Sequence, residues 1–385
     1  MIELPDAKSV KVSLYGRTVG RLALTPDGVC AFQYDAAFAQ NGYSISPLKL
    51  PLTPELFIAG PQPFDGGFGV FDDSLPDGWG RLVQDRFLRA NGVDPDRLTV
   101  LQRLLLIGSD ARGALSYELP EDGSHRINNT LPPASSPAPV SGSEIEALAG
   151  RAKLLTTENS RAGESMTNDD FAALYRFSGS SGGARPKAFL YMDGKEWLVK
   201  FHASDDPADI GEIEYRTSLL AKNCGIEMPE TRLFEGRYFG AARFDRTPEG
   251  KIHAASAAGL LNADYRIPSL DYTGLLALCR ILTRDMAEVE QLFTRMVFNV
   301  IIGNRDDHAK NFAFLMNEQG EWRLSPAYDL LPSYGFGGYH TTTANGSGRP
   351  KRADLLAVAS AAGVPEKKAG AIIKRIEERI TEIKF

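Results

Sequence analysis

Residues 301–311 read Ile-Ile-Gly-Asn-Arg-Asp-Asp-His-Ala-Lys-Asn and follow the apolar segment 292–300. This run places Asp306 five residues before Asn311. Eighteen residues beyond Asn311, a second carboxylate, Asp329, stands between a tyrosine and two leucines. A carboxylate, an amide and a second carboxylate supply the hard oxygen atoms that magnesium prefers. The spacing therefore indicates a loop with chemistry to perform.

The spacing is that of a phosphotransferase loop. In protein kinases the catalytic Asp is followed five residues later by an Asn that binds magnesium, and a later Asp also binds metal. Phosphoryl transfer needs positioning and charge neutralisation, so one carboxylate orients the attacking hydroxyl while other oxygens hold the metal. Asp306 suits the first role, and Asn311 and Asp329 suit the second. The same residue types also cap helices and solvate turns, so the short pattern needs support from elsewhere in the chain.

A glycine-rich segment upstream gives part of that support. Residues 177–187 read Phe-Ser-Gly-Ser-Ser-Gly-Gly-Ala-Arg-Pro-Lys, and glycines let backbone N–H groups approach a phosphate closely. Residues 187–192 and 196–201 have the composition of two strands joined by a tight Asp-Gly turn. A glycine-rich loop bounded by strands is typical of a kinase nucleotide lid, although a Ser/Gly segment is also a common flexible connection.

Lys200 ends the second of these strands. A kinase binds phosphate with a Lys on the strand after the lid and pairs that Lys with a helix Glu. Residues 210–222 have helical spacing, which predicts Glu214 as the partner, with Glu212 as the alternative. An edge charge and a helix-dipole complement would explain the same residue types. The order of lid, Lys, Glu, Asp-x4-Asn and Asp favours the phosphotransferase.

Five sequence words spread over most of the chain complete the pattern. They lie at 72–80 (Asp-Asp-Ser-Leu-Pro-Asp-Gly-Trp-Gly), 182–187 (Gly-Gly-Ala-Arg-Pro-Lys), 243–246 (Arg-Phe-Asp-Arg), 306–312 (Asp-Asp-His-Ala-Lys-Asn-Phe) and 328–332 (Tyr-Asp-Leu-Leu-Pro). Together they resemble the HipA family of bacterial serine/threonine kinases, the toxins of HipBA-type toxin–antitoxin pairs. Before 243–246 the sequence has Gly-Ala-Ala where many relatives have Glu before the Arg, in a stretch whose backbone would contact adenine.

The resemblance implies a set of roles. Asp306 would be the catalytic Asp, and Asn311 and Asp329 the magnesium ligands. The residues expected around ATP are Ser181, Gly182, Gly183, Lys200, Glu214, Arg243, Phe244, His308 and Lys310. His308 reads as a structural hydrogen-bonder and not as a zinc ligand. Ser180, with Ser181 and Ser178 as alternatives, would be autophosphorylated, and the added charge would repel ATP and shut the enzyme off.

The chain is expected to have an α+β, two-lobed protein-kinase-like fold with a small β-rich N-terminal region and a mostly helical C-terminal lobe. Residues 1–120 would form the N-terminal HipA-like region, a β meander followed by helices. Residues 121–142 form a Pro/Ser-rich connection, 143–246 the nucleotide-binding lobe and 247–385 the helical catalytic lobe.

Composition restricts the location and the partners. The chain has 385 residues, 43% hydrophobic, and a net charge of −6, which disfavours direct binding to nucleic acid. The three cysteines, Cys30, Cys224 and Cys279, lie far apart in apolar contexts, as reduced core thiols do. No apolar run approaches membrane-spanning length, so we expect a cytoplasmic protein.

The sequence therefore predicts an ATP- and magnesium-dependent protein serine/threonine kinase of toxin type. By resemblance, its partners would be a small helix-turn-helix, HipB-like antitoxin and a protein substrate such as an aminoacyl-tRNA synthetase, with DNA reached only through the antitoxin. The alternatives are a small-molecule phosphotransferase, which shares the Asp, Asn and Asp geometry, and a non-catalytic antitoxin-binding regulator, which would need none of these residues.

Overall fold

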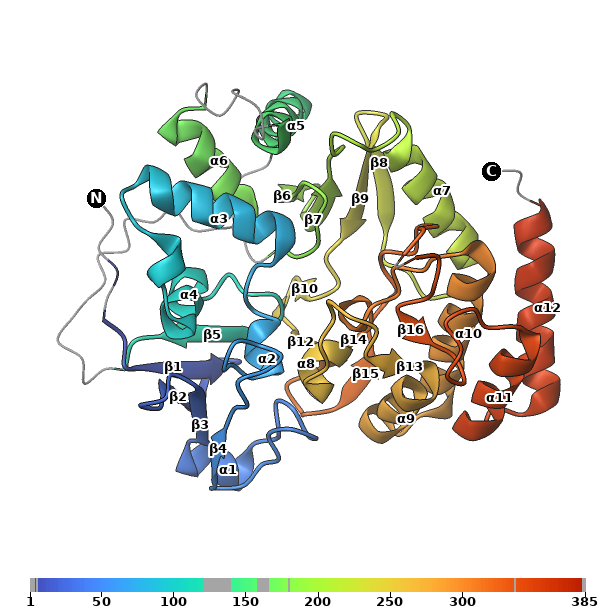
Figure 1. Cartoon of the computed structure of the whole chain (residues 1–385), viewed down its shortest axis with the longest axis horizontal. Coiled ribbons are helices and arrows are strands. Elements are labelled where there is room, and N and C mark those ends of the chain that lie inside the picture. The colour runs from blue at the N-terminus through green and yellow to red at the C-terminus, as the bar shows by residue number, and fades with distance from the viewer. Residues whose placement is uncertain are drawn as a thin grey trace.

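The computed structural model describes residues 4, 6–120, 140–157, 166–178, 181–335 and 337–382. Most of the predicted Pro/Ser-rich connection, residues 121–139, and Ser180 lie outside these ranges. The fold is mixed α and β, with a β-rich N-terminal region and a helical C-terminal part, as the sequence predicts (Figure 1).

The N-terminal region is built on a five-stranded antiparallel sheet with the order β4-β3-β2-β1-β5. Its strands are β1 (Ser9–Leu14), β2 (Arg17–Leu24), β3 (Cys30–Tyr34), β4 (Leu56–Ile58) and β5 (Leu115–Glu118). In β1, Val10, Val12 and Leu14 are buried while the residues between them are partly exposed, because successive side chains of a strand point to opposite faces. The predicted meander is confirmed as β1–β3.

Helices separate β3 from β5 in the sequence and lie between this sheet and the rest of the molecule (Figure 1). They are α1 (Ala36–Asn41), α2 (Gly69–Asp72), α3 (Gly78–Ala90), the 3-10 helix η1 (Pro95–Arg97) and α4 (Val100–Ile107). The helix stop predicted at Asn91-Gly92 is confirmed, since Asn91 is the C-terminal cap of α3. Thr99 and Gln102 form a capping box that begins α4.

A second antiparallel sheet, with the order β6-β7-β9-β8, forms the nucleotide lobe. Its elements are α5 (Gly142–Thr157), α6 (Asn168–Ser178), β6 (Lys187–Met192), β7 (Lys195–Lys200), α7 (Ile210–Asn223), β8 (Thr231–Phe234) and β9 (Tyr238–Ala242). Asp193 and Gly194 both have positive φ, which makes the predicted tight turn between β6 and β7.

The rest of the chain is mainly helical and carries short strand pairs. Its elements are β10 (Arg246–Thr247), β11 (Gly250–Lys251), β12 (His253–Ser256), α8 (Ala257–Leu261), β13 (Leu270–Asp271), α9 (Tyr272–Thr283), α10 (Met286–Ile302), η3 (Ala309–Asn311), β14 (Ala313–Met316), β15 (Trp322–Leu324), β16 (Thr342–Thr343), α11 (Arg352–Ala362) and α12 (Glu366–Glu382). Among the described residues, no helix combines the length and the apolar character needed to cross a membrane.

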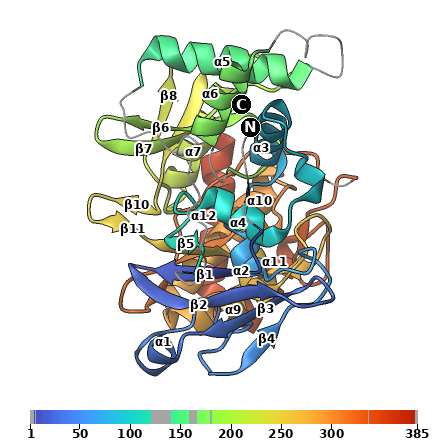
Figure 2. The same ribbon diagram turned by 90° about the vertical axis from the view of Figure 1, so that its left-hand side faces the viewer.

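Two hydrophobic cores hold these parts together. The larger core is continuous from the N-terminal sheet, for example Phe32, to α9 and α10, for example Phe293. The smaller core lies under the β6–β9 sheet and includes Trp79, Val83 and Phe87 of α3. Helix α3 thus packs with the nucleotide lobe although it belongs to the N-terminal region, and Figure 2 shows it beside α6. All three cysteines are buried free thiols.

Candidate active site

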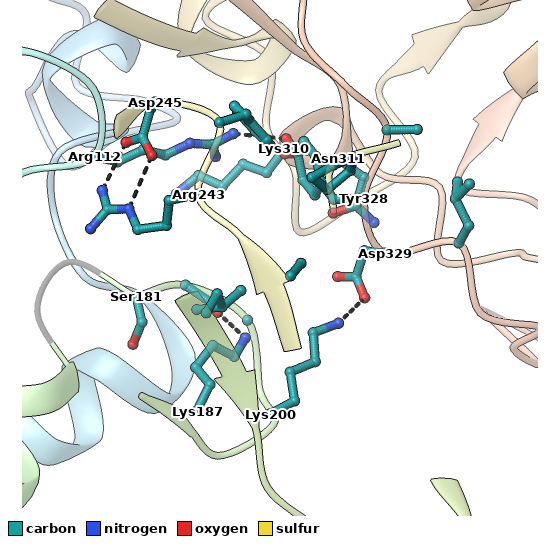
Figure 3. A pocket seen from close by; sticks show the side chains of 18 of the residues that line it. Arg112, Ser181, Lys187, Lys200, Arg243, Asp245, Lys310, Asn311, Tyr328 and Asp329 are labelled. Carbon is teal, nitrogen blue, oxygen red and sulfur yellow. Dashed lines mark hydrogen bonds and ion pairs between the residues drawn. The ribbon is translucent and has the colours of Figure 1, made fainter. Parts of the chain in front are cut away.

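A pocket lies between the β6–β9 sheet and the C-terminal part, and N-terminal residues close one wall of it (Figure 3). Lys200 comes from the sheet, Asn311 and Asp329 from the C-terminal part, and Asp73 and Arg112 from the N-terminal region. The predicted lid, lysine and metal segments therefore meet at one place.

The catalytic loop is fixed at both ends. Helix α10 stops at Gly303, whose φ of 74° lets the chain leave the helix. Asn304 donates from its side-chain amide to the Asn299 Oδ1 and to the Asp329 carbonyl, both at 3.1 Å. A single amide thus ties the end of α10 to the segment that carries the second predicted metal ligand.

Asp306 is exposed on this loop. Its backbone is held, because its N–H donates to the Ser333 Oγ at 2.9 Å and its carbonyl accepts from the Asn311 Nδ2 at 2.6 Å. Partial burial raises the pKa of the Asp306 carboxyl, and the nearby Asp329 carboxylate adds to the rise while His308 opposes it. The carboxylate itself has no printed hydrogen bond, so it is available to a substrate hydroxyl.

The adjacent Asp307 has the opposite environment, since its side chain is fully buried. The carboxylate accepts hydrogen bonds from the Tyr272 hydroxyl (2.8 Å), the His340 Nδ1 (3.0 Å) and the backbone N–H groups of Thr341 (2.9 Å) and Thr342 (3.2 Å). It joins α9, the catalytic loop and the segment before β16. The sequence analysis assigned it no role, and nothing in the local sequence separates it from Asp306.

Lys200 lies at the centre of the charged groups. Its ammonium is paired with Glu214 and lies 2.7 Å from Asp329 Oδ1 (Figure 3). Burial alone would lower the pKa of Lys200, but the Asp329 and Glu214 carboxylates outweigh burial and hold it above its usual range. Of the two glutamates considered, Glu214 makes the pair, whereas Glu212 pairs with Arg216 at 2.6 Å.

Asp329 and Asn311 both line the pocket and have the oxygen atoms that suit magnesium. The ammonium of Lys200 holds the pKa of Asp329 well below its usual range, so the group is a carboxylate. No group of three or more His, Cys, Asp or Glu residues that could hold a metal occurs among the described residues. An all-protein metal cage is therefore not formed there, whereas one carboxylate and one amide oxygen fit a magnesium ion that is completed by phosphate and water.

The described part of the glycine-rich loop is held by the N-terminal region. The Asp77 carboxylate accepts from the Gly183 N–H at 2.5 Å, and the Trp79 N–H donates to the Gly183 carbonyl at 2.9 Å. A side chain on Gly78 would collide with the Gly183 carbonyl oxygen, because its Cβ would lie 2.4 Å away. Close approach of two backbones thus explains the glycine at position 78.

The three candidate serines of this loop differ in what the structure says of them. Ser180 lies outside the described residues. Ser178 and Ser181 are buried, and the Ser181 Oγ, which lines the pocket, has no hydrogen-bond partner. Phosphate could reach Ser178 or Ser181 only after the loop has left this position.

Further predicted ATP contacts also line the pocket, but two of them are already engaged. Arg243 donates to Asp245 and Glu196, and its guanidinium stacks on the Phe189 ring at 4.3 Å. The Lys310 ammonium contacts Asp72 at 3.0 Å and Asp77 at 2.8 Å. These two cations organise the pocket wall in the ligand-free arrangement.

Phe244 and His308 have simpler surroundings in the same pocket. Phe244 packs near the Tyr328 ring, with the centroids 5.7 Å apart. The His308 Nδ1 accepts from the Lys310 N–H at 3.2 Å, as the N-terminal cap of η3. This is the structural hydrogen bond that the sequence analysis expected of His308.

The N-terminal contribution is what the sequence analysis missed. Arg112, Asp72 and Asp77 all act on the pocket, since Arg112 donates to the Tyr328 hydroxyl at 2.9 Å and the two carboxylates bind Lys310. Tyr328 in turn donates to the Lys310 carbonyl at 2.6 Å. The word at 72–80 was the only available signal, and it gave no indication of which residues it would contact.

The arrangement defines a two-lobed, protein-kinase-like fold with an N-terminal β region attached. Residues 179–383 match the family described as HipA-like C-terminal domain, and residues 10–118 match the HipA N-terminal domain. The chain therefore belongs to the HipA family.

Individual relatives agree with this assignment. The chain is 26% identical over 357 residues to "Putative kinase Y4dM" of Sinorhizobium fredii, covering 85% of this chain and 78% of that protein. It is 28% identical over 353 residues to "Putative kinase Y4mE" of the same organism, covering 83% and 76%. Its fold resembles a chain of the Shewanella oneidensis complex of HipA, HipB and operator DNA, with a TM-score of 0.66 and 19% identity over 97% of this chain and 89% of that one.

Proposed function

We propose that this protein is an ATP- and magnesium-dependent protein serine/threonine kinase of toxin type. One observation carries the proposal: Lys200 bridges Glu214 and Asp329 inside the pocket, while the exposed Asp306 stands on the adjoining loop. A structural ion pair would explain Lys200 and Glu214, but it would not require the pocket or a free carboxylate with a raised pKa beside it.

The residues divide the reaction between them. Lys200 turns from Asp329 to the phosphates of ATP, and Glu214 keeps its ammonium in place. Asn311 and Asp329 hold the magnesium ion, which neutralises charge on the phosphates when it is bound. Asp306 orients the serine hydroxyl of the substrate and accepts its proton as the oxygen attacks the γ-phosphorus and ADP leaves. The raised pKa of Asp306 makes it a better proton acceptor than an ordinary carboxylate.

The partners follow from the family. The solved HipA relative is described with HipB and operator DNA, so we propose a small helix-turn-helix antitoxin of the HipB type, with DNA contacted through it. The substrate class that the family suggests is an aminoacyl-tRNA synthetase, and the place of action is the cytoplasm. Phosphorylation of the glycine-rich loop, at Ser180 or at Ser178 or Ser181, would be the means of self-inhibition, because phosphate there repels ATP and displaces the loop.

The test compares Asp306→Asn with the parent and with Asp27→Asn, an exposed carboxylate in the β2–β3 turn. ATP turnover and incorporated phosphate, located by mass spectrometry, are measured with magnesium. We expect Asp306→Asn to lose at least about 100-fold in rate with an unchanged melting temperature, because a general base contributes that much and an exposed carboxylate contributes little to packing.

The outcomes separate the parts of the proposal. Parental activity in Asp306→Asn would remove Asp306 from the base role, and absence of ATP turnover in the parent would overturn the kinase assignment. Phosphate on the loop that depends on Asp306 and accompanies loss of ATP binding supports self-inhibition. A fully active enzyme that carries stoichiometric loop phosphate would contradict self-inhibition alone.

A further inference from the structure

A second cavity lies beside the catalytic loop and takes no part in the chemistry described above. It has a volume of about 410 Å³ and is lined by Val300, Arg305, Tyr334, Gly338, His340, Arg349 and Pro350. Arg305 directly precedes Asp306, and Arg349 and Pro350 come just before α11, in the orange-red part of Figure 1. The cavity therefore adjoins the proposed site of phosphoryl transfer.

The charge of the cavity is positive although the chain carries a net charge of −6. Within the described residues, no carboxylate is paired with the guanidinium of Arg305 or of Arg349. His340 is the third basic group, and its Nδ1 is already bonded to Asp307. Two guanidinium groups without a counter-charge form a site that a carboxylate would complement.

The apolar part of the wall is aromatic and exposed. Tyr334 is 75% exposed and Tyr339, next to the cavity, is 49% exposed. The Arg349 guanidinium lies 4.3 Å from the Tyr339 ring centroid, which restricts its position before any ligand binds. Tyrosine and arginine supply much of the binding energy of protein interfaces, because they bury area and keep polar ends for hydrogen bonds.

The cavity is also tied to the catalytic loop by hydrogen bonds. The Ser333 Oγ accepts from both the Arg305 N–H (3.0 Å) and the Asp306 N–H (2.9 Å), and the Thr341 N–H donates to the Arg305 carbonyl at 3.1 Å. The segment on both sides of Tyr334 and His340 is thus held in register with Asp306. A polypeptide seated in the cavity would therefore present its neighbouring residues to Asp306.

We propose that this cavity binds an acidic segment of the protein substrate, with Arg305 and Arg349 as the specificity-determining residues. The inference rests on the proposed kinase function and adds the chemical class of its substrate. Since consecutive Cα atoms are about 3.8 Å apart, the Asp or Glu residues lie within about four residues of the serine that is phosphorylated.

The experiment uses the full chain with magnesium and a non-hydrolysable ATP analogue. Three fluorescein-labelled serine peptides, which differ only in having Glu, Gln or Lys on both sides of the serine, are titrated by anisotropy. We expect the Glu peptide to bind at least about tenfold more tightly than the Gln peptide, and the Lys peptide to bind most weakly. The preference should shrink at high salt, because salt screens exposed charges.

The variants Arg305→Ala and Arg349→Ala should each weaken binding of the Glu peptide about fivefold and leave the Gln peptide unchanged. Arg305→Lys retains the charge and should recover part of the loss, which keeps the test valid if Arg305→Ala is unstable. The control is Arg216→Ala on α7, whose exposed side chain pairs with Glu212, and it should have no effect.

Equal affinity for the Glu and Gln peptides, or an unchanged preference in both arginine variants, would overturn the proposal. The kinase assignment is read separately, from ATP turnover and phosphate transfer without the analogue. Selective binding of the Glu peptide by a protein without ATP turnover would retain the docking surface and reject the kinase. Equal phosphorylation of the Glu and Gln peptides would do the reverse.

Discussion

Asp306 and Asp307 show how burial divides two identical neighbours into chemistry and support. The Asp306 side chain is exposed, so it can meet a substrate, whereas the Asp307 carboxylate is fully buried among four hydrogen-bond donors. A buried carboxylate is stable only with such partners, because an unpaired buried charge is costly. Asp307 is therefore a positioning residue for the catalytic loop.

Asp307→Asn should lower the free energy of unfolding by about 3 kcal/mol, because an amide cannot accept from all four donors and leaves some of them unpaired. Urea unfolding of this variant beside Asp306→Asn measures the difference. We expect the first variant to lose stability and activity together and the second to lose activity alone. Equal stability of the two variants would show that the Asp307 network does not hold the loop.

Asp245 makes stability depend on pH. Burial alone would raise the pKa of its carboxyl, but Arg243 and Arg246 outweigh burial and lower it. A lowered folded-state pKa gives stability that is fully present above about pH 4 and is lost as the pH falls below that value toward the folded pKa.

The difference in unfolding free energy between the parent and Asp245→Asn should therefore be largest near neutral pH and should shrink in acid. Denaturant unfolding at several values from about pH 7 to pH 3 tests this, and carboxylates common to both proteins cancel in the difference. A difference that is constant with pH would mean that the Asp245 charge contributes no stability.

At the scale of elements, the start of α3 acts as a clamp on the glycine-rich loop. Asp77 receives the Gly183 N–H and the Lys310 ammonium, so one side chain joins the N-terminal region, the lid and the catalytic loop. Asp72 reaches Lys310 but has no printed contact with the lid. The pair of carboxylates thus offers a matched comparison.

Asp77→Ala should weaken binding of an ATP analogue about tenfold, because the lid loses a charge-assisted hydrogen bond that holds it over the pocket. Asp72→Ala, which leaves the Gly183 contact intact, should weaken binding by less. Isothermal calorimetry on both variants gives the comparison. If the two variants bind equally well, the clamp on Gly183 contributes nothing to nucleotide affinity.

For the whole molecule, the larger core makes the N-terminal region part of one folding unit. Phe32 of β3 and Phe293 of α10 belong to the same continuous set of buried side chains. The Tyr15 hydroxyl also accepts from the His253 N–H at 2.7 Å, across the same boundary. Removal of the N-terminal region would expose a large apolar surface on the remainder.

Residues 140–385 expressed alone should therefore be insoluble or unfold without cooperativity, and co-expression with residues 1–139 should restore solubility. Scanning calorimetry of the full chain should show a single transition, since the core crosses the boundary between the two regions. A soluble 140–385 fragment with parental nucleotide affinity would contradict this prediction.

The sequence alone determined the features that depend on local pattern. The β1–β3 meander follows from alternation of apolar residues, the β6–β7 turn from Asp-Gly, and the end of α3 from Asn91-Gly92, because each reflects the backbone preferences of a few adjacent residues. The loop at 301–311 likewise announced its chemistry by spacing. These signals need no knowledge of distant contacts.

Only the tertiary structure decided how distant residues share the work. It placed Glu214 and not Glu212 on Lys200, buried Asp307 beside the exposed Asp306, and brought Asp77 to Gly183 across more than a hundred positions in the chain. Burial and partner choice arise from packing between separate elements, so identical residue types receive different roles. The sequence encodes those contacts collectively, and no local pattern displays them.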